Sequence, residues 1–176
     1  MVVINPADAI EMEQAVFAAA DYAGPVYIRL GRMPVPVIHH SEYHFEIGKG
    51  ELVHDGEDVA IIATGSMVWT ALEAAEKLER ENHISALVMN IHTLKPLDDE
   101  LISWAARKTG RVVTIEEHSV IGGLGSAVCE TLSRHAPVKV KVMGIEDRFG
   151  QSGTANELLQ HYKLTAEDLI QNVLSF

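Results

Sequence analysis

The segment from Glu116 to His118 holds residue types that proteins often use for acid–base chemistry. It follows an apolar run, residues 111–115, which we predict to be a strand, and open α/β sheets often place functional groups at the carboxyl ends of strands. Paired carboxylates beside an imidazole can transfer protons. Polar loop residues or a subunit contact are the alternatives, because proximity in sequence does not establish geometry. We therefore treat Glu117 and His118 as a possible functional loop and assign no catalytic residue.

A glycine-rich turn, Gly122–Ser126, lies between a predicted strand and a predicted helix, where backbone N–H groups can hold an anion. It does not fit Gly-x-Gly-x-x-Gly, because the third glycine position counted from Gly123 is Val128, and no Gly-Lys-Ser/Thr follows. A partial match is weak support for a nucleotide site. Close packing of a helix on a sheet explains the glycines equally well, so both roles stay open.

Three histidines, His39, His40 and His44, gather in a stretch that contains prolines and has no clean periodicity. Three imidazoles can bind zinc, but no cysteine or regularly spaced carboxylate completes a ligand set. We therefore expect a solvated loop here and no metal site in the chain.

Two arginines, Arg29 and Arg32, close the first predicted strand–helix–strand unit. The planar guanidinium of an arginine at a strand end can bind a phosphate through two hydrogen bonds. From the residues alone, a surface salt bridge is the default role for both.

Composition excludes several classes of function. The chain has 176 residues, a formal net charge of -11 and no basic stripe, which disfavours nucleic-acid binding. Its single cysteine, Cys129, excludes a disulfide within the chain and fits a reducing compartment. No apolar run approaches the ~18 residues that span a membrane, and no signal-peptide pattern precedes the first helix. We expect a cytoplasmic protein.

The first 34 residues form one strand–helix–strand pattern. Residues 2–4 and 26–30 are predicted strands, and the helix between them begins with Asn5 as its cap and Pro6 in its first turn. A lone unit of this kind exposes strand edges and apolar faces. We therefore expect residues 1–34 to be mobile or to pack against another copy. An extended linker follows at residues 35–47.

Strands and helices alternate from residue 48 onward, which predicts an α/β fold. The expected architecture has three layers, α/β/α, around a mixed, mostly parallel sheet of about five strands. The first strand is joined to the second by a short turn, which only an antiparallel connection fits. Two capping-box patterns, at Thr154 and Thr165, predict the last helices. The predicted strands are 49–53, 59–63, 84–89, 111–115 and 138–143, and the earlier helices are 67–81, 98–110 and 122–134.

Five segments in order resemble the transketolases, which are thiamine-diphosphate-dependent enzymes. The sequence of residues 147–153 most resembles the C-terminal subunit of the split type. The same superfamily includes deoxyxylulose phosphate synthases and the β subunits of 2-oxo acid dehydrogenases. Either of these, or a non-catalytic subunit-binding module, is the alternative. The five segments are residues 24–32, 58–66, 93–98, 116–126 and 144–170.

The resemblance implies a five-stranded mixed sheet with one antiparallel strand, and a division of the chain into three parts. Residues 1–34 would be a remnant of the pyrimidine-binding domain, 35–47 a linker, and 48–176 the C-terminal domain. It also implies an enzyme that moves a two-carbon ketol unit between sugar phosphates, with thiamine diphosphate and Mg²⁺ or Ca²⁺ as cofactors. Its expected partners are a second copy and, if the enzyme is split, an N-terminal transketolase subunit.

The cofactor-binding parts of that family lie elsewhere. The diphosphate and metal are held by a Gly-Asp-Gly type motif that this chain lacks, and the activating glutamate precedes the region matched here. We therefore expect this chain alone to bind no cofactor and to be inactive, with a role in assembly and in part of the substrate channel. Arg32 matches the arginine that contacts the substrate phosphate in relatives, and is our candidate phosphate ligand.

Overall fold

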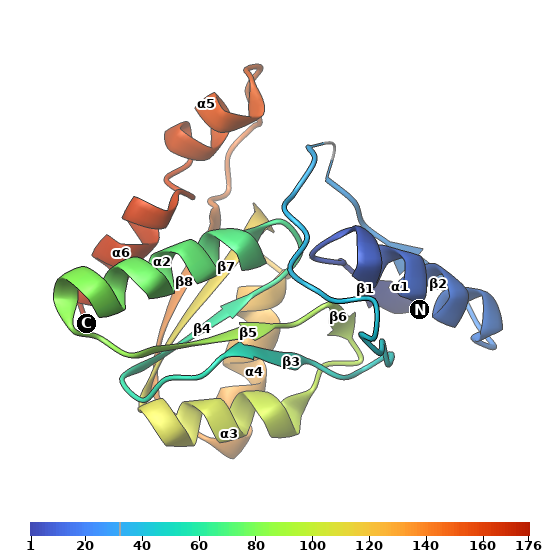
Figure 1. Cartoon of the computed structure of the whole chain (residues 1–176), viewed down its shortest axis with the longest axis horizontal. Helices are drawn as coiled ribbons and strands as arrows, with labels where there is room; N and C mark the ends of the chain where they lie inside the picture. The colour runs from blue at the N-terminus through green and yellow to red at the C-terminus, as the bar shows by residue number, and fades with distance from the viewer. Residues whose placement is uncertain (32) are drawn as a thin grey trace.

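The computed structural model describes residues 1–31 and 33–176. The chain forms two sheets flanked by helices (Figure 1). Its elements, in chain order, are β1 (Val2–Ile4), α1 (Ala9–Asp21), β2 (Val26–Ile28), β3 (Glu51–His54), β4 (Val59–Ala63), α2 (Met67–Asn82), β5 (Ala86–Asn90), β6 (Thr93–Lys95), α3 (Asp99–Thr109), β7 (Arg111–Ser119), α4 (Leu124–His135), β8 (Lys139–Ile145), α5 (Ala155–His161) and α6 (Ala166–Leu174).

The larger sheet has five strands in the order β3-β5-β4-β7-β8. Four of them are parallel, and β3 is antiparallel to its neighbour. The predicted mixed, mostly parallel sheet is therefore confirmed. The expected hairpin partner was wrong: β3 pairs with β5, which lies between β3 and β4. β4 is buried along its whole length whereas β3 is mostly half-buried, so β4 takes the centre and β3 the edge.

Alternate residues of β4 face opposite layers, because side chains alternate along a strand. Val59 and Ile61 join a core formed with α2 and α6, and Ala60 and Ile62 join a second core formed with α3 and α4. Figure 1 shows these two helix pairs on opposite faces of the sheet, with α5 projecting beyond it. The sheet is thus buried on both sides, as expected for a three-layer fold.

The N-terminal strand–helix–strand unit forms the second sheet, in the order β2-β1-β6. β6 belongs to the later part of the chain, yet it pairs antiparallel with β1. The Asn5 N–H also donates to the His92 carbonyl at 2.8 Å. Residues 1–31 therefore pack against the rest of the same chain, which differs from the mobile or copy-bound unit that we expected. The sequence pattern did not predict this pairing, because β6 has only three residues and they directly precede Pro96.

The helix starts were predicted with mixed success. The capping boxes at Thr154 and Thr165 are both present. The cap of α1 is Asp8 and not Asn5, since the Asp8 side chain accepts the Glu11 N–H at 2.9 Å. Serine is a common helix cap, but Ser66, which precedes α2, makes no side-chain capping bond and donates its hydroxyl to Glu117 instead.

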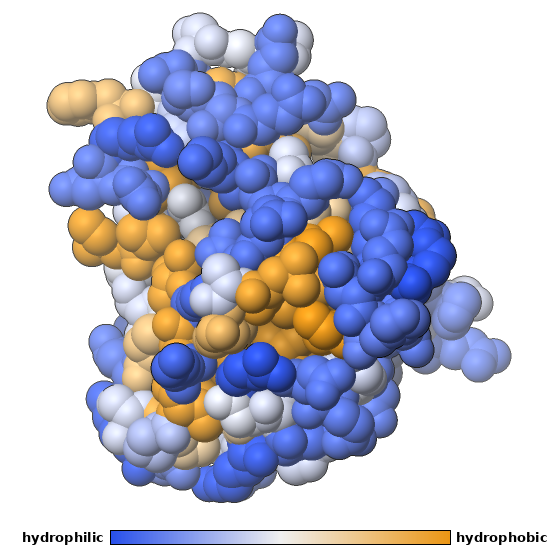
Figure 2. Space-filling model, turned by 90° about the vertical axis from the view of Figure 1, so that its left-hand side faces the viewer, coloured by the Kyte–Doolittle hydropathy of each residue, from blue (hydrophilic) through white to orange (hydrophobic). Residues whose placement is uncertain are grey.

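Polar side chains cover most of the face on the side of the C-terminus, with hydrophobic ones gathered between them (Figure 2). Among the described helices, none has the length and apolar composition needed to cross a membrane.

Candidate functional site

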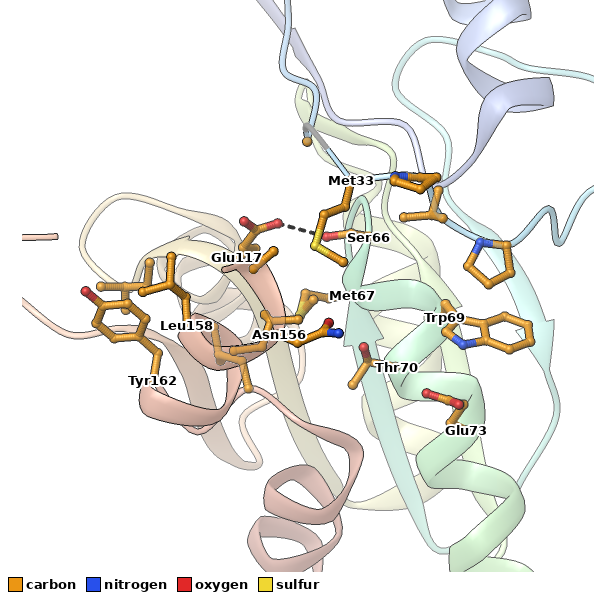
Figure 3. A pocket seen from close by; sticks show the side chains of 18 of the residues that line it. Met33, Ser66, Met67, Trp69, Thr70, Glu73, Glu117, Asn156, Leu158 and Tyr162 are labelled. Carbon is orange, nitrogen blue, oxygen red and sulfur yellow. Dashed lines mark hydrogen bonds between the residues drawn. The ribbon is translucent and has the colours of Figure 1, made fainter. Parts of the chain in front are cut away.

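A cavity of about 380 Å³ opens beside the carboxyl ends of β4, β7 and β8. This is the edge where open parallel sheets bind their ligands, and the volume lies in the usual range for small-molecule sites. Its walls come from the segment after β2, the start of α2, the ends of β7 and β8, and α5 (Figure 3).

The cavity has apolar walls with a few polar groups among them. Met67 and Leu158 contribute to the apolar lining, while Ser66, Thr70 and Asn156 bring hydroxyl and amide groups from α5 and the start of α2 (Figure 3). Hydroxyls and amides both donate and accept hydrogen bonds. Such a lining suits a small molecule that carries hydroxyl groups.

Glu117 lies at this cavity and His118 does not. The Ser66 hydroxyl donates to the Glu117 carboxylate at 3.0 Å (Figure 3), and the Arg29 guanidinium donates to the Glu117 carbonyl. His118 is exposed, and its Nδ1 lies 3.2 Å from the carbonyl of the adjacent Ser119. The predicted functional loop is instead the last part of strand β7, in which Glu117 faces the cavity and His118 does not. The functional role of either residue stays a prediction.

The predicted phosphate ligand, Arg32, lies outside the described residues. Its neighbours Gly31 and Met33 both line the cavity. Arg29, the other candidate, is held by the carbonyl of Glu117.

Glu116 occupies the anion position at the start of α4. It is buried, with Oε2 accepting the Leu124 N–H at 2.8 Å and Oε1 accepting the Gly125 N–H at 2.9 Å. A Cβ on Gly123 would lie 2.1 Å from Glu116 Oε2, and one on Gly125 would lie 2.3 Å from a methyl group of Val142. The glycines therefore make room for the Glu116 carboxylate and for close packing on β8. The Glu116 carboxylate already occupies the helix N-terminus.

A second group of ionisable and polar side chains lies between the N-terminal unit and the larger domain. We call it the buried acid cluster; its members are Asp8, Glu11, His39, Tyr43, Glu51 and Asn90. Asp8 Oδ2 accepts the N–H groups of Ile38 and His39 at 2.8 and 2.9 Å. This carboxylate therefore ties α1 to the segment that follows β2.

Glu11 is the centre of this cluster and is fully buried. Its Oε1 accepts the Tyr43 hydroxyl at 2.6 Å and the Asn90 amide at 2.8 Å, and its Oε2 accepts the Ala7 N–H at 2.6 Å. Burial raises the pKa of Glu11, and these hydrogen bonds only partly oppose the shift. The donors come from three separate segments, so this one carboxylate joins all of them.

His39 was expected to lie in a solvated loop with His40 and His44, and this was wrong for His39 alone. His40 and His44 are exposed, whereas His39 is buried between carboxylates of Asp8 and Glu51. Burial by itself lowers the pKa of His39, but the hydrogen bond to Glu51 and the nearby charges outweigh it and raise the pKa to about 8. No local sequence pattern indicates this burial, because the acidic partners of His39 are far from it along the chain.

Comparisons with known proteins agree with this fold. A family profile described as "Transketolase, C-terminal domain" matches residues 48–169. The "Putative transketolase C-terminal section" of Methanocaldococcus jannaschii is 44% identical over 177 residues, covering 99% of this chain and 55% of that protein. The 1-deoxy-D-xylulose-5-phosphate synthase of Heliobacterium modesticaldum is 42% identical over 172 residues, covering 96% of this chain and 26% of that protein.

A solved structure, described as "Split gene transketolase, inactive beta4 tetramer", matches with a TM-score of 0.95 and 50% identity. The match covers 99% of this chain and 57% of that one, so this chain spans about half the length of its transketolase relatives. Because the profile covers most of the chain, the family is established. The chain therefore belongs to the transketolase family and carries its C-terminal domain.

Proposed function

We propose that this chain is the C-terminal part of a transketolase that transfers a two-carbon ketol unit between sugar phosphates. The observation that supports this most strongly is the likeness to the split-gene transketolase over 99% of the chain at 50% identity. In this proposal the cavity beside β4, β7 and β8 is the chain's share of the substrate channel. Residues 1–34 are the end of the pyrimidine-binding domain, 35–47 a linker, and 48–176 the C-terminal domain.

Thiamine diphosphate and its divalent cation do not fit the residues of this chain. The only glycine-rich turn at a helix start among the described residues already holds the Glu116 carboxylate, and a second anion there would be repelled. The sequence also lacks a Gly-Asp-Gly motif. We propose that an N-terminal transketolase polypeptide supplies the cofactor site, and that the complete enzyme is built on a dimer of this chain.

The purified chain is expected to show no ketol transfer when it is given thiamine diphosphate, Mg²⁺, a ketose phosphate donor and an aldose phosphate acceptor. Adding an N-terminal transketolase polypeptide should restore the activity, because the missing cofactor site then joins the cavity. Product formation is measured by coupled assay, and cofactor binding by calorimetry on the chain alone. Turnover by the isolated chain would contradict the proposal.

A second function is favoured by the 42% identity to a 1-deoxy-D-xylulose-5-phosphate synthase. The two activities differ in the donor, because the synthase name implies a product that lacks a hydroxyl at carbon 1. The assembled enzyme is therefore tested with a ketose phosphate and with pyruvate, each with the same aldose phosphate acceptor. Condensation of pyruvate with the acceptor, without turnover of the ketose phosphate, would identify the synthase. Decarboxylation of pyruvate without a condensation product would indicate a 2-oxo acid dehydrogenase.

Arg32→Ala in the assembled enzyme should raise KM for a phosphorylated donor by about 10- to 100-fold, since a charge-assisted hydrogen bond contributes ~1.5–3 kcal/mol. The KM for the same sugar without its phosphate should not change. Arg134→Ala, at an exposed arginine on α4, is the matched control. An equal loss for both forms of the donor would show that Arg32 does not bind the phosphate.

A further inference from the structure

The buried acid cluster brings together three atoms of a type that binds metal ions. Glu11, His39 and Glu51 each offer one ligand atom, and these atoms lie within 4.8 Å of one another. His39 Nε2 is 2.8 Å from Glu51 Oε2 and 3.8 Å from Glu11 Oε1. Ligand atoms around a tetrahedral ion with bonds of ~2.0–2.2 Å are ~3.3–3.6 Å apart, so the His39–Glu51 pair would open by roughly half an ångström to hold one. We propose that Glu11, His39 and Glu51 bind a divalent transition-metal ion, with Zn²⁺ as the best match.

The orientation of His39 supports this site. Its Nδ1 is buried 2.9 Å from Asp8 Oδ2 without forming a hydrogen bond among the described residues, and its Nε2 is directed to the other two carboxylates. Metal-binding histidines usually donate their second ring N–H to a carboxylate, which fixes the tautomer and the ring. Asp8 is itself held by backbone N–H groups at 2.8 and 2.9 Å, so this support is rigid.

The charges of the cluster also favour a cation. Asp8, Glu11 and Glu51 are three carboxylates against a single imidazole, and among the described residues no lysine or arginine pairs with them. The side chains of Asp8 and Glu11 are fully buried, where uncompensated charge is costly. Asn90 Oδ1 is a buried acceptor with no partner among the described residues. Its amide nitrogen donates to Glu11 Oε1 at 2.8 Å, which places this residue beside the proposed site.

The donor set and the access route narrow the choice of ion. One imidazole with two carboxylates suits Zn²⁺, whereas Mg²⁺ and Ca²⁺ prefer oxygen ligands alone. Glu51 is 35% exposed at its side chain and lines two surface depressions, so an ion can reach the cluster without unfolding. The three ligands come from α1, the segment after β2, and β3. A bound ion would therefore fasten the N-terminal unit to the larger domain.

The test uses the full chain after removal of metals with a chelator. Titration with ZnCl₂ in a calorimeter should show one ion per chain, and Co²⁺ should give the visible absorption of a four-coordinate site. Zn²⁺ should also raise the melting temperature as its concentration rises, because it binds the folded state. Mg²⁺ should produce none of these effects.

Substitutions separate this site from adventitious binding by surface histidines. Glu51→Gln removes a ligand at the edge of the cluster and should weaken Zn²⁺ binding by about 100-fold or more, since supporting residues alone contribute ~10- to 100-fold. His40→Ala and His44→Ala, at exposed neighbours of His39, should leave it unchanged. Circular dichroism confirms that each variant is folded. The proposal is overturned if the chain does not bind Zn²⁺ stoichiometrically, because the cluster would then be a hydrogen-bonded histidinium and nothing more. It is also overturned if only the His40 and His44 variants lose binding.

Discussion

Replacing Glu116 with alanine is expected to lower the free energy of unfolding by roughly 3–5 kcal/mol. The carboxylate accepts the buried N–H groups of Leu124 and Gly125, and each donor left without a partner costs ~1–3 kcal/mol. The negative charge also stabilises the start of α4 through the helix dipole, by ~0.3–1 kcal/mol. Urea denaturation followed by circular dichroism measures the change.

The adjacent residue provides the control for this experiment. Glu117 has the same side chain one position along β7, but it is exposed, and among the described residues its carboxylate receives only the Ser66 hydroxyl. Glu117→Ala should leave the stability unchanged, while it alters the wall of the cavity. Equal stability losses in the two variants would show that Glu116 has no special role at the helix start.

These two neighbours also show what the sequence can and cannot predict. It placed Glu116 and Glu117 just after a strand that ends at residue 115, whereas both lie in the last part of β7, and it correctly placed Gly122–Ser126 at the start of a helix. It did not show that the carboxylate of one motif fills the anion position of the other, eight residues away along the chain. Side-chain direction at a strand end depends on local twist, which a pattern of residue types does not contain.

Local patterns predicted the elements well where burial is extreme. β4 has the predicted bounds, because five consecutive apolar residues permit little except a strand buried on both faces. Sheet order was less accessible: a short turn correctly required β3 to be antiparallel, but it did not reveal that β5 inserts between β3 and β4. Strand neighbours are decided by packing between distant segments, which the sequence records only indirectly.

The buried acid cluster could not be predicted from the sequence either, because it too depends on contacts between distant segments. Glu11 and Asn90 are 79 positions apart and nevertheless share a hydrogen bond. Each of its carboxylates resembles an ordinary surface residue when its neighbours in sequence are considered alone. The expectation of a mobile N-terminal unit followed from overlooking this cluster and the β1–β6 pairing.

Replacing Glu11 with alanine is expected to loosen the N-terminal unit while the five-stranded sheet stays folded. Three donors, Ala7 N–H, the Tyr43 hydroxyl and the Asn90 amide, lose their acceptor. At ~1–3 kcal/mol each, offset by the cost of burying a carboxylate, the net loss is about 3 kcal/mol. Because ~1.4 kcal/mol is a factor of ten, amide hydrogen exchange in β1 should become about 100-fold faster, measured with a chelator present so that no metal contributes.

Two further variants show whether the hydrogen bonds of Glu11 cause this effect. Glu11→Gln keeps one carbonyl oxygen for Tyr43 and Asn90 but cannot accept the Ala7 N–H through its amide nitrogen, so its effect should be intermediate. Glu13→Ala, at an exposed position on the same helix, should change nothing. Amides of β4 should remain protected in every variant, since that strand lies in a separate core. If β1 exchanges as fast as an unfolded peptide before any substitution, then the cluster does not hold the unit in solution, and our first expectation of a mobile N-terminus would stand.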